Sequence, residues 1–137
     1  MPVYLQEEEA HRGHAISEHV GKSANYLLNR VRTETYDLGK VTVYMFRSGS
    51  FPSVGAAEKL VNSTLSSNAA EVNRVATGQV PEAFVKVEFG APTGIEAFRE
   101  SPRQSPYIRD TFSVGVYIKH DPASPKGYSV ITAYPMN

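Results

Sequence analysis

The last third of the chain constrains the fold most, because two alternating segments follow one another there with no helix between them. Residues 112 to 119 and 128 to 134 alternate apolar and polar side chains and are rich in β-branched and aromatic residues. The segment between them contains Pro122 and Pro125, which favour a loop. We therefore predict an antiparallel hairpin at this end of the chain.

Helical spacing of apolar residues precedes and follows a first strand-like segment. This order of helices, strand, helices and consecutive strands predicts an α+β fold, with N-terminal helices packed on a mainly antiparallel, twisted sheet. The expected elements are helices over residues 13 to 20, 24 to 32, 53 to 65 and 68 to 78, and strands over residues 41 to 46 and 83 to 89, in addition to the hairpin.

Two segments lack a clear period. Residues 1 to 12 are polar and acidic, so we predict a flexible lead-in or the end of a linker there, and place the domain in residues 13 to 137. Residues 90 to 110 hold three prolines among Gly, Ser and Arg. They predict a long surface excursion suited to contacts with a substrate or partner.

Composition excludes several classes of protein. The 137 residues include no cysteine, so thiolate chemistry, thiolate zinc sites and disulfides are absent and the domain must fold by packing alone. The longest apolar runs are far shorter than the roughly twenty residues that span a bilayer, and the acidic N-terminus does not resemble a secretory signal. The 14 basic and 14 acidic residues balance, so overall charge does not identify a partner.

Cofactor and metal sites have little support in the sequence. No glycine fingerprint or Walker lysine loop is present, so a Rossmann fold and a nucleotide cofactor are not expected. His11, His14 and His19 lie within nine positions, but no further ligand stands at a matching spacing, and zinc normally takes three protein ligands. We predict no metal site, and a surface position for His11.

His19 and Arg30 are the first pair of residues that suggest chemistry. In one straight helix their Cα atoms would be about 16 Å apart. A bend at Gly21 would let the second helix fold back and bring the guanidinium near the imidazole. Imidazole can transfer a proton near neutral pH, and guanidinium can hold a phosphate with two hydrogen bonds. Lys22, at the same bend, could add charge or simply be solvated.

Thr132 and Tyr134 form a second pair, two residues apart on the last predicted strand. Side chains with this spacing share one face of a strand. A hydroxyl and a phenol that project together could bind a phosphate oxygen. Packing alone also favours Thr and Tyr in strands, so the pair by itself does not decide between a site and a structural role.

Taken together, these segments resemble the ribonuclease A-like toxin domains of bacterial contact-dependent growth inhibition proteins and related polymorphic toxins. The resemblance covers residues 13 to 135 and implies a ribonuclease A-like fold without disulfides. It implies catalytic roles for His19, Arg30, Thr132 and Tyr134. The segments that carry it are His19-Val20-Gly21-Lys22-Ser23, Arg30, the Ser-rich turn at residues 48 to 53, Asn68 and Thr132-Ala133-Tyr134-Pro135.

The resemblance further implies RNA cleavage without a metal or other cofactor, in which the ribose 2′-hydroxyl attacks the adjacent phosphate and leaves a 2′,3′-cyclic phosphate. Such a toxin is secreted as part of a larger delivery protein, acts in the cytoplasm of the target cell and is neutralised by an immunity protein. Apart from that complex we expect a monomer. Residues 90 to 110 are the expected contact surface for the immunity protein.

The general acid is not identified by the sequence. His14 and His120 are candidates, although His14 could instead pack within the first helix and His120 could be an exposed loop residue. We place His14 and Lys22 as weaker substrate-binding candidates. Two other functions remain as alternatives. A non-catalytic protein-interaction module would need no convergence of the four residues, and an ADP-ribosyltransferase-like toxin would need a catalytic glutamate, for which only Glu88 lies on a predicted strand.

Overall fold

The computed structural model describes residues 2 to 11, 13 to 38 and 41 to 137, with the side chains of these ranges except those of residues 11 and 36 to 43. The expected surface position of His11 therefore lies outside the described side chains. The elements in chain order are α1 (Leu5–His11), α2 (Ala15–His19), α3 (Ala24–Thr33), β1 (Thr35–Leu38), β2 (Val41–Tyr44), β3 (Arg47–Ser50), α4 (Val54–Ser67), α5 (Ala69–Ala76), β4 (Glu82–Glu88), β5 (Gly94–Phe98), β6 (Tyr107–Thr111), β7 (Ser113–His120) and β8 (Tyr128–Met136).

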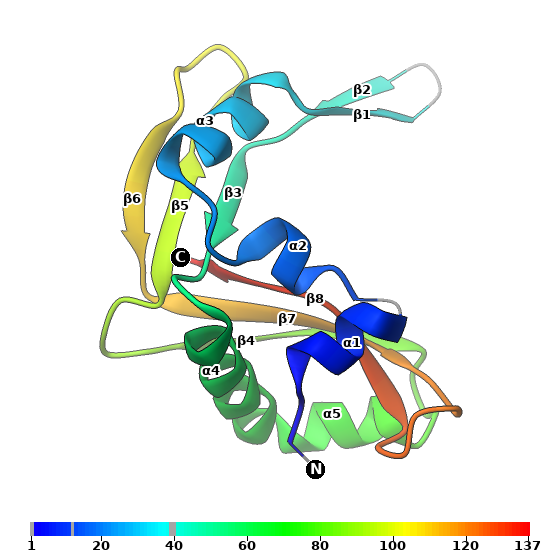
Figure 1. The fold of residues 1–137 in the computed structure, drawn as a ribbon. Helices are drawn as coiled ribbons and strands as arrows, with labels where there is room; N and C mark the ends of the chain where they lie inside the picture. Colours follow the sequence, from blue (N-terminus) through cyan, green and yellow to red (C-terminus); the bar gives the residue numbers. More distant parts are fainter. Residues whose placement is uncertain (1, 12, 39–40) are drawn as a thin grey trace.

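The predicted C-terminal hairpin is confirmed as β7-β8, and β4 pairs with the other side of β7 to give a three-stranded sheet in the order β4-β7-β8, with both pairs antiparallel. Helices α4 and α5 lie along one side of this sheet (Figure 1). Val114, Val116 and Ile118 of β7 are fully buried, in one cluster with Val61 and Val75 of the two helices. The α+β class follows from this arrangement.

A second antiparallel sheet, in the order β3-β5-β6, lies in the other half of the molecule (Figure 1). Helix α3 covers one face of it, where Leu27, Val31 and Ala97 are fully buried. This corrects the prediction of a long surface excursion over residues 90 to 110, because β5 and most of β6 lie in that range. The three prolines, which concealed the strand pattern, stand outside these strands.

Residues 2 to 11 also differ from the prediction of a flexible lead-in. Val3 and Leu5 are fully buried in the main core. Their backbone N–H groups donate to Asn62 Oδ1 at 2.7 Å and to Glu58 Oε1 at 2.9 Å, both on α4. The reason for the difference is that only two apolar residues anchor the segment, two positions apart, and a helical period cannot be recognised from two residues.

The helices at the start of the predicted domain are confirmed, and Gly21 stands at the bend between α2 and α3 with a left-handed φ of 67°. Ser23 caps α3 by accepting a hydrogen bond from the N–H of Tyr26 at 3.1 Å. The predicted strand over residues 41 to 46 is shorter, and it pairs with β1, which was not predicted. Of the serine-rich segment expected as a turn, residues 48 to 50 belong to β3, and only residues 51 to 53 connect β3 to α4.

The end of β3 holds α2 and β8 close to one another. The N–H of Phe51 donates to the His19 carbonyl at 2.7 Å, and the N–H of Gly21 donates to the Phe51 carbonyl at 2.8 Å. On the other side, a Cβ added to Gly49 would come within 2.3 Å of the Pro135 carbonyl oxygen. A side chain cannot fit between β3 and β8 there, so Gly49 allows the two strands to approach. Across the described ranges, every helix is too short or too polar to traverse a bilayer.

Candidate active site

His19 is the last residue of α2, and its side chain is almost completely buried. Its Nδ1 lies 2.9 Å from the carbonyl oxygen of Gly49. Because a carbonyl oxygen can only accept, Nδ1 carries the hydrogen and donates it. In the neutral ring the lone pair is therefore on Nε2, which can accept a proton.

The imidazole ring of His19 stays neutral even when the pH is well below the physiological value. Burial lowers the pKa of His19 from 6.5 to about 4, and the nearby charges of Arg30 and His14 act in the same direction. The hydrogen bond to Gly49 and the carboxylate of Glu18 oppose this shift but do not cancel it. His19 is therefore available as a proton acceptor at neutral pH.

Arg30 comes from α3 and reaches the same place because the chain turns at Gly21. Its Nη2 lies 3.6 Å from Glu18 Oε2, and its Nε donates to Glu34 Oε2 at 3.0 Å. Burial acts to lower the pKa of Arg30, but the hydrogen bond and charge of Glu34, with the charge of Glu18, raise it overall. Nη1 is buried and has no hydrogen-bond partner among the described residues. It is therefore a charged donor available to an anion.

Tyr134 of β8 faces His19, with 5.2 Å between the two ring centroids. Burial raises the pKa of Tyr134, against the opposing positive charge of Arg47, so its hydroxyl stays protonated at neutral pH. Thr132 lies two residues earlier on the same strand, with Oγ1 buried and without a hydrogen-bond partner in the described part of the chain. Thr132 does not itself line the cavity described next.

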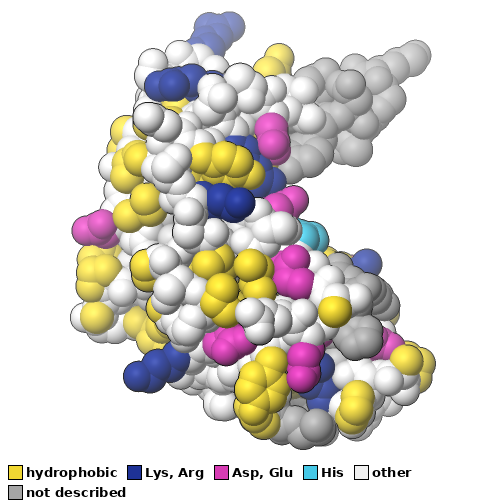
Figure 2. Space-filling view, viewed as in Figure 1, with side chains coloured by type: hydrophobic (Ala, Val, Ile, Leu, Met, Phe, Trp, Pro, Cys, Tyr) yellow, Lys and Arg dark blue, Asp and Glu magenta, His cyan; other side chains and the backbone are white. Residues whose placement is uncertain are grey.

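The side chains of His19, Arg30 and Tyr134 open onto one cavity of about 240 Å³. Figure 2 shows a histidine in the hollow between the two halves of the molecule, with acidic side chains beside it. Ser48 Oγ also lines the cavity, buried and without a partner among the residues described. The full lining is Glu18, His19, Arg30, Met45, Arg47, Ser48, Gly49, Glu96, Tyr134 and Pro135.

Glu18 is a site residue that sequence reasoning missed. Its Oε2 lies 3.5 Å from His14 Nε2, 3.7 Å from His19 Nε2 and 3.6 Å from Arg30 Nη2. One carboxylate oxygen is thus shared by three groups that can carry positive charge. The signal in the sequence was the spacing of four between His14 and Glu18, which places both on one side of a helix.

Arg47 of β3 and Glu96 of β5 were missed as well, because the first lies just before the expected turn, outside any expected element, and the second lies in the expected surface excursion. Glu96 is fully buried, and both Nε and Nη2 of Arg109 lie 2.8 Å from its Oε2. Arg47 Nε lies 3.5 Å from the other oxygen, Oε1. Since Arg109 already neutralises Glu96, Arg47 contributes positive charge to the cavity.

Comparison with known proteins identifies the group of proteins to which this arrangement belongs. A family model described as "Bacterial CdiA-CT RNAse A domain" matches residues 13 to 135. The chain belongs to this family. A solved structure similar to this CdiA-CT domain is titled "Crystal structure of CdiA-CT/CdiI complex from Y. kristensenii 33638". It is 29% identical, with a TM-score of 0.74, over 91% of this chain and 100% of that chain.

The family assignment and the structural similarity establish a ribonuclease A-like α+β fold for this CdiA-CT domain, in a family of ribonuclease toxin domains. Among curated proteins, the comparison found no significant match. The resemblance pointed to His19 and Arg30 near the start of the sequence and to Tyr134 near its end. These three residues line one cavity of this domain.

The weaker candidates stand further from the cavity of the CdiA-CT domain. The side chain of His14 is 42% exposed and reaches the site only through Glu18. Lys22 Nζ lies 5.1 Å from the ring centroid of Tyr26, and Lys22 lines a different hollow beside Gly21. His120 ends β7 and its Nδ1 lies 2.8 Å from the Val75 carbonyl oxygen. His120 is therefore neither an exposed loop residue nor a candidate acid at this site.

Within the described ranges, no three His, Cys, Asp or Glu side chains gather in a way that could hold a metal ion. What the CdiA-CT domain does bring together is a proton acceptor, a phenol that keeps its proton, and two guanidinium groups. These are the groups that a phosphodiester transesterification needs: a base, an acid and positive charge at the phosphate.

Proposed function

We propose that this domain is a metal-independent endoribonuclease that cleaves RNA through attack of the ribose 2′-hydroxyl on the adjacent phosphate. The observation that carries the proposal is that one cavity is lined both by His19, whose Nε2 has a free lone pair, and by Arg30, whose Nη1 has no partner among the described residues. A phosphodiester held by Arg30 would place its neighbouring ribose hydroxyl beside the imidazole.

In the first half of the reaction, His19 Nε2 takes the proton of the 2′-hydroxyl while the 2′-oxygen forms a bond to phosphorus. The imidazolium that results is stabilised by the carboxylate of Glu18, which lies 3.7 Å from Nε2. Arg30 and Arg47 hold the non-bridging oxygens of the phosphate, on which negative charge increases. Glu18 thus acts through His19 and Arg30 as a positioning residue.

In the second half, the bond between phosphorus and the 5′-oxygen breaks, and that oxygen needs a proton. Tyr134 is next to His19 and retains its hydroxyl proton, since burial raises its pKa. We assign Tyr134 as the proton donor, and the imidazolium returns a proton to the phenolate through the bound water that replaces the product. Thr132 lies two residues before Tyr134 on the same face of β8. The product ends in a 2′,3′-cyclic phosphate.

The family supports a proposal for the biological setting. The similar structure is a complex of a CdiA-CT domain with CdiI, so we propose that a cognate immunity protein neutralises this domain too. We further propose that the domain is delivered as the C-terminal toxin part of a larger secreted protein and acts on RNA in the cytoplasm of the target cell. Outside the immunity complex it is expected to be a monomer.

The proposal is tested by incubating the purified protein with total RNA in the presence of a chelator. Wild type is expected to degrade the RNA, and His19→Ala is expected to lose activity by at least about 100-fold because it removes the general base. His120→Ala is a matched control, since this histidine bonds Val75 away from the cavity. Equal degradation by wild type and His19→Ala would remove His19 from the reaction.

A further inference from the structure

A row of aromatic rings leads out of the catalytic cavity onto the open face of the sheet β4-β7-β8. His19 and Tyr134 have ring centroids 5.2 Å apart, and Tyr134 and Phe84 of β4 follow at 5.9 Å. The planes of Tyr134 and Phe84 differ by 33°. Phe84 is 47% exposed, so a face of its ring is open to solvent beside the cavity.

The position of the Phe84 ring is fixed by a glycine beneath it. A Cβ added to Gly115 of β7 would come within 2.3 Å of Phe84 Cζ and 3.1 Å of Met136 Sδ. Gly115 therefore provides the space that the Phe84 ring occupies beside Met136 and Tyr134. A ring held in this way loses little conformational freedom when a flat ligand stacks on it.

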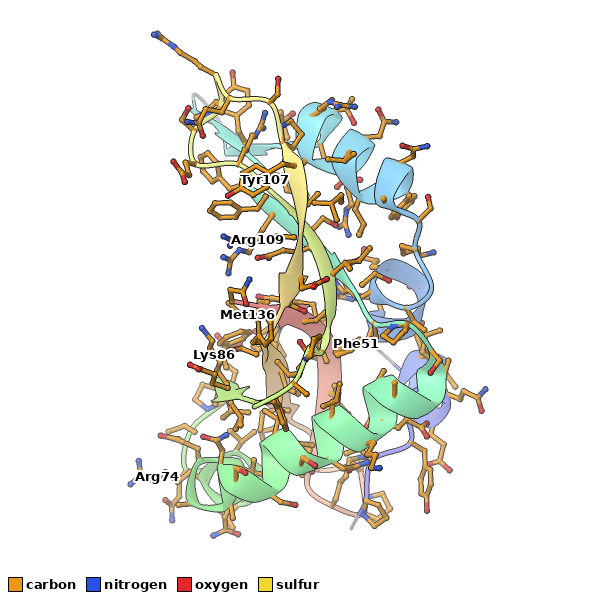
Figure 3. The ribbon with its side chains drawn as sticks, turned by 90° about the vertical axis from the view of Figure 1, so that its left-hand side faces the viewer. Phe51, Arg74, Lys86, Tyr107, Arg109 and Met136 are labelled. Carbon is orange, nitrogen blue, oxygen red and sulfur yellow. The ribbon has the colours of Figure 1, made fainter. Side chains whose placement is uncertain are left out.

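Basic side chains lie along the same side of the molecule, where Glu82 and Glu88 also share the exposed face of β4 and Arg109 is paired with Glu96. Lys86 is exposed and, two residues after Phe84 on β4, shares its face. Figure 3 shows Lys86, Met136 and Arg109 one above another along this side. Further along, Arg109 stacks on the ring of Phe98, with 3.8 Å between its Cζ and the ring centroid. Arg47 of the cavity lies 5.4 Å from the same ring.

Of the described helices, α3, α4 and α5 pack on the opposite faces of the two sheets, and α2 reaches this surface only at its His19 end. Buried residues of β7 pack with α4 and α5 on the opposite face of the first sheet, and α3 packs with Ala97, which points away from Glu96 and Phe98 on the second sheet. The aromatic and basic side chains thus lie on uncovered faces that continue from the catalytic cavity. Exposed aromatic rings interleaved with Lys and Arg are typical of proteins that bind single-stranded nucleic acid.

We propose that Phe84 is a base-stacking subsite for single-stranded RNA, next to the phosphate that is cleaved. A base of the substrate stacks on the Phe84 ring, while Lys86 and Arg47 contact phosphates on either side of it. A duplex is excluded from this subsite because its bases are already stacked on one another and present no free face. The inference rests on the proposed ribonuclease function and specifies its substrate as unpaired RNA.

The test measures binding of a mixed-sequence RNA ten-mer, fully 2′-O-methylated so that it cannot be cleaved, by fluorescence anisotropy. Phe84→Ala is expected to weaken binding roughly 5-fold to 150-fold, the effect of losing one stacked base. Phe84→Tyr keeps an aromatic face and is expected to bind like wild type. Phe84→Leu fills the space without an aromatic face and is expected to bind as weakly as Phe84→Ala, so the test does not depend on one variant folding.

Two controls separate stacking from other effects. Phe112→Ala removes another exposed phenylalanine, 42% exposed and outside the aromatic row, and should leave the affinity unchanged. Lys86→Gln should reduce the slope of log affinity against log salt by about 1, as expected for one phosphate contact. A duplex of the same sequence is expected to show no difference between wild type and Phe84→Ala.

Equal affinity of wild type and Phe84→Ala for the single strand would overturn this inference. That result is distinct from failure of the proposed function, which is judged by whether wild type cleaves unmodified RNA. If wild type cleaves RNA and Phe84→Ala binds the methylated strand as tightly, the subsite alone is wrong. If wild type cleaves no RNA, the ribonuclease function is wrong whatever Phe84 does.

Discussion

At the scale of single residues, the chemistry depends on a histidine that stays neutral. The Gly49 carbonyl fixes the hydrogen on Nδ1 of His19, and burial holds the pKa of this ring at about 4. Below about pH 6.5 the unfolded chain binds a proton at this residue while the folded protein does not. The contribution of His19 to the free energy of unfolding is therefore fully present above pH 6.5. This contribution is lost as the pH falls from 6.5 toward 4.

This linkage predicts that wild type loses about 3 kcal/mol of stability through His19 alone between pH 7 and pH 4. The measurement is urea unfolding at several pH values, compared with His19→Gln, which has no titrating ring and should show a shallower pH dependence. An NMR titration of the His19 ring gives the pKa directly. A midpoint near 6.5, as in an exposed histidine, would contradict the assignment of His19 as a buried neutral base.

Glu18 gives a second prediction at this scale. Its charge raises the pKa of His19 and lies beside the proton that Nε2 receives, so Glu18→Gln should lower both the His19 pKa and the rate of cleavage. We expect a loss of about 10-fold in kcat, equivalent to about one pKa unit. Glu34→Gln is the matched control for the His19 pKa, since Glu34 bonds Arg30 and is not among the charges that shift the pKa of His19. A Glu18→Gln variant with wild-type kcat would show that Glu18 is not a positioning residue.

At the scale of elements, α1 and the residues before it are part of the fold. Leu5 is fully buried, and its N–H bonds Glu58 of α4. Leu5→Ala should therefore lower the free energy of unfolding by about 2 to 5 kcal/mol. Tyr4→Ala, at a neighbouring residue that is 52% exposed, should change it by less than about 0.5 kcal/mol. Equal effects of both variants in urea unfolding would show that this segment does not pack as described.

The elements also show what the sequence could and could not predict. Helices α2 to α5, β4 and the β7-β8 hairpin had clear periods, caps or alternation, and they were predicted with small shifts at their ends. Strands β3, β5 and β6 were missed because their inward residues include Ser48, Ser50 and Ala97, which give little hydrophobic contrast with their neighbours. Their pairing depends on contacts distant in sequence, which local patterns do not contain.

The residues of the candidate site also fall into those that the sequence predicted and those that it did not. His19, Arg30 and Tyr134 were predicted from the motifs at the two ends of the chain, and they meet at one cavity. Glu18, Arg47 and Glu96 were not predicted, because their roles arise only from distances between elements that the sequence does not order. Lys22 precedes α3, the helix that carries Arg30, but its side chain lies over the ring of Tyr26 and lines a different hollow.

At the scale of the whole molecule, the site exists only where the two halves meet. Arg30 and Arg47 belong to the half built on β3-β5-β6, whereas Tyr134 belongs to the sheet β4-β7-β8 and His19 to α2, which bonds the end of β3 (Figure 1). The contact of Gly49 with Pro135 keeps these halves close. The central claim is therefore that this junction performs transesterification through the 2′-hydroxyl.

The most direct measurement of that claim compares a short mixed-sequence RNA with the same sequence carrying 2′-O-methyl groups throughout, each incubated with wild-type protein in chelator. We predict that only the unmodified RNA is cut, and that ³¹P NMR of the products detects a 2′,3′-cyclic phosphate. Cleavage of the methylated strand, or products that carry a 5′-phosphate and no cyclic phosphate, would contradict the account.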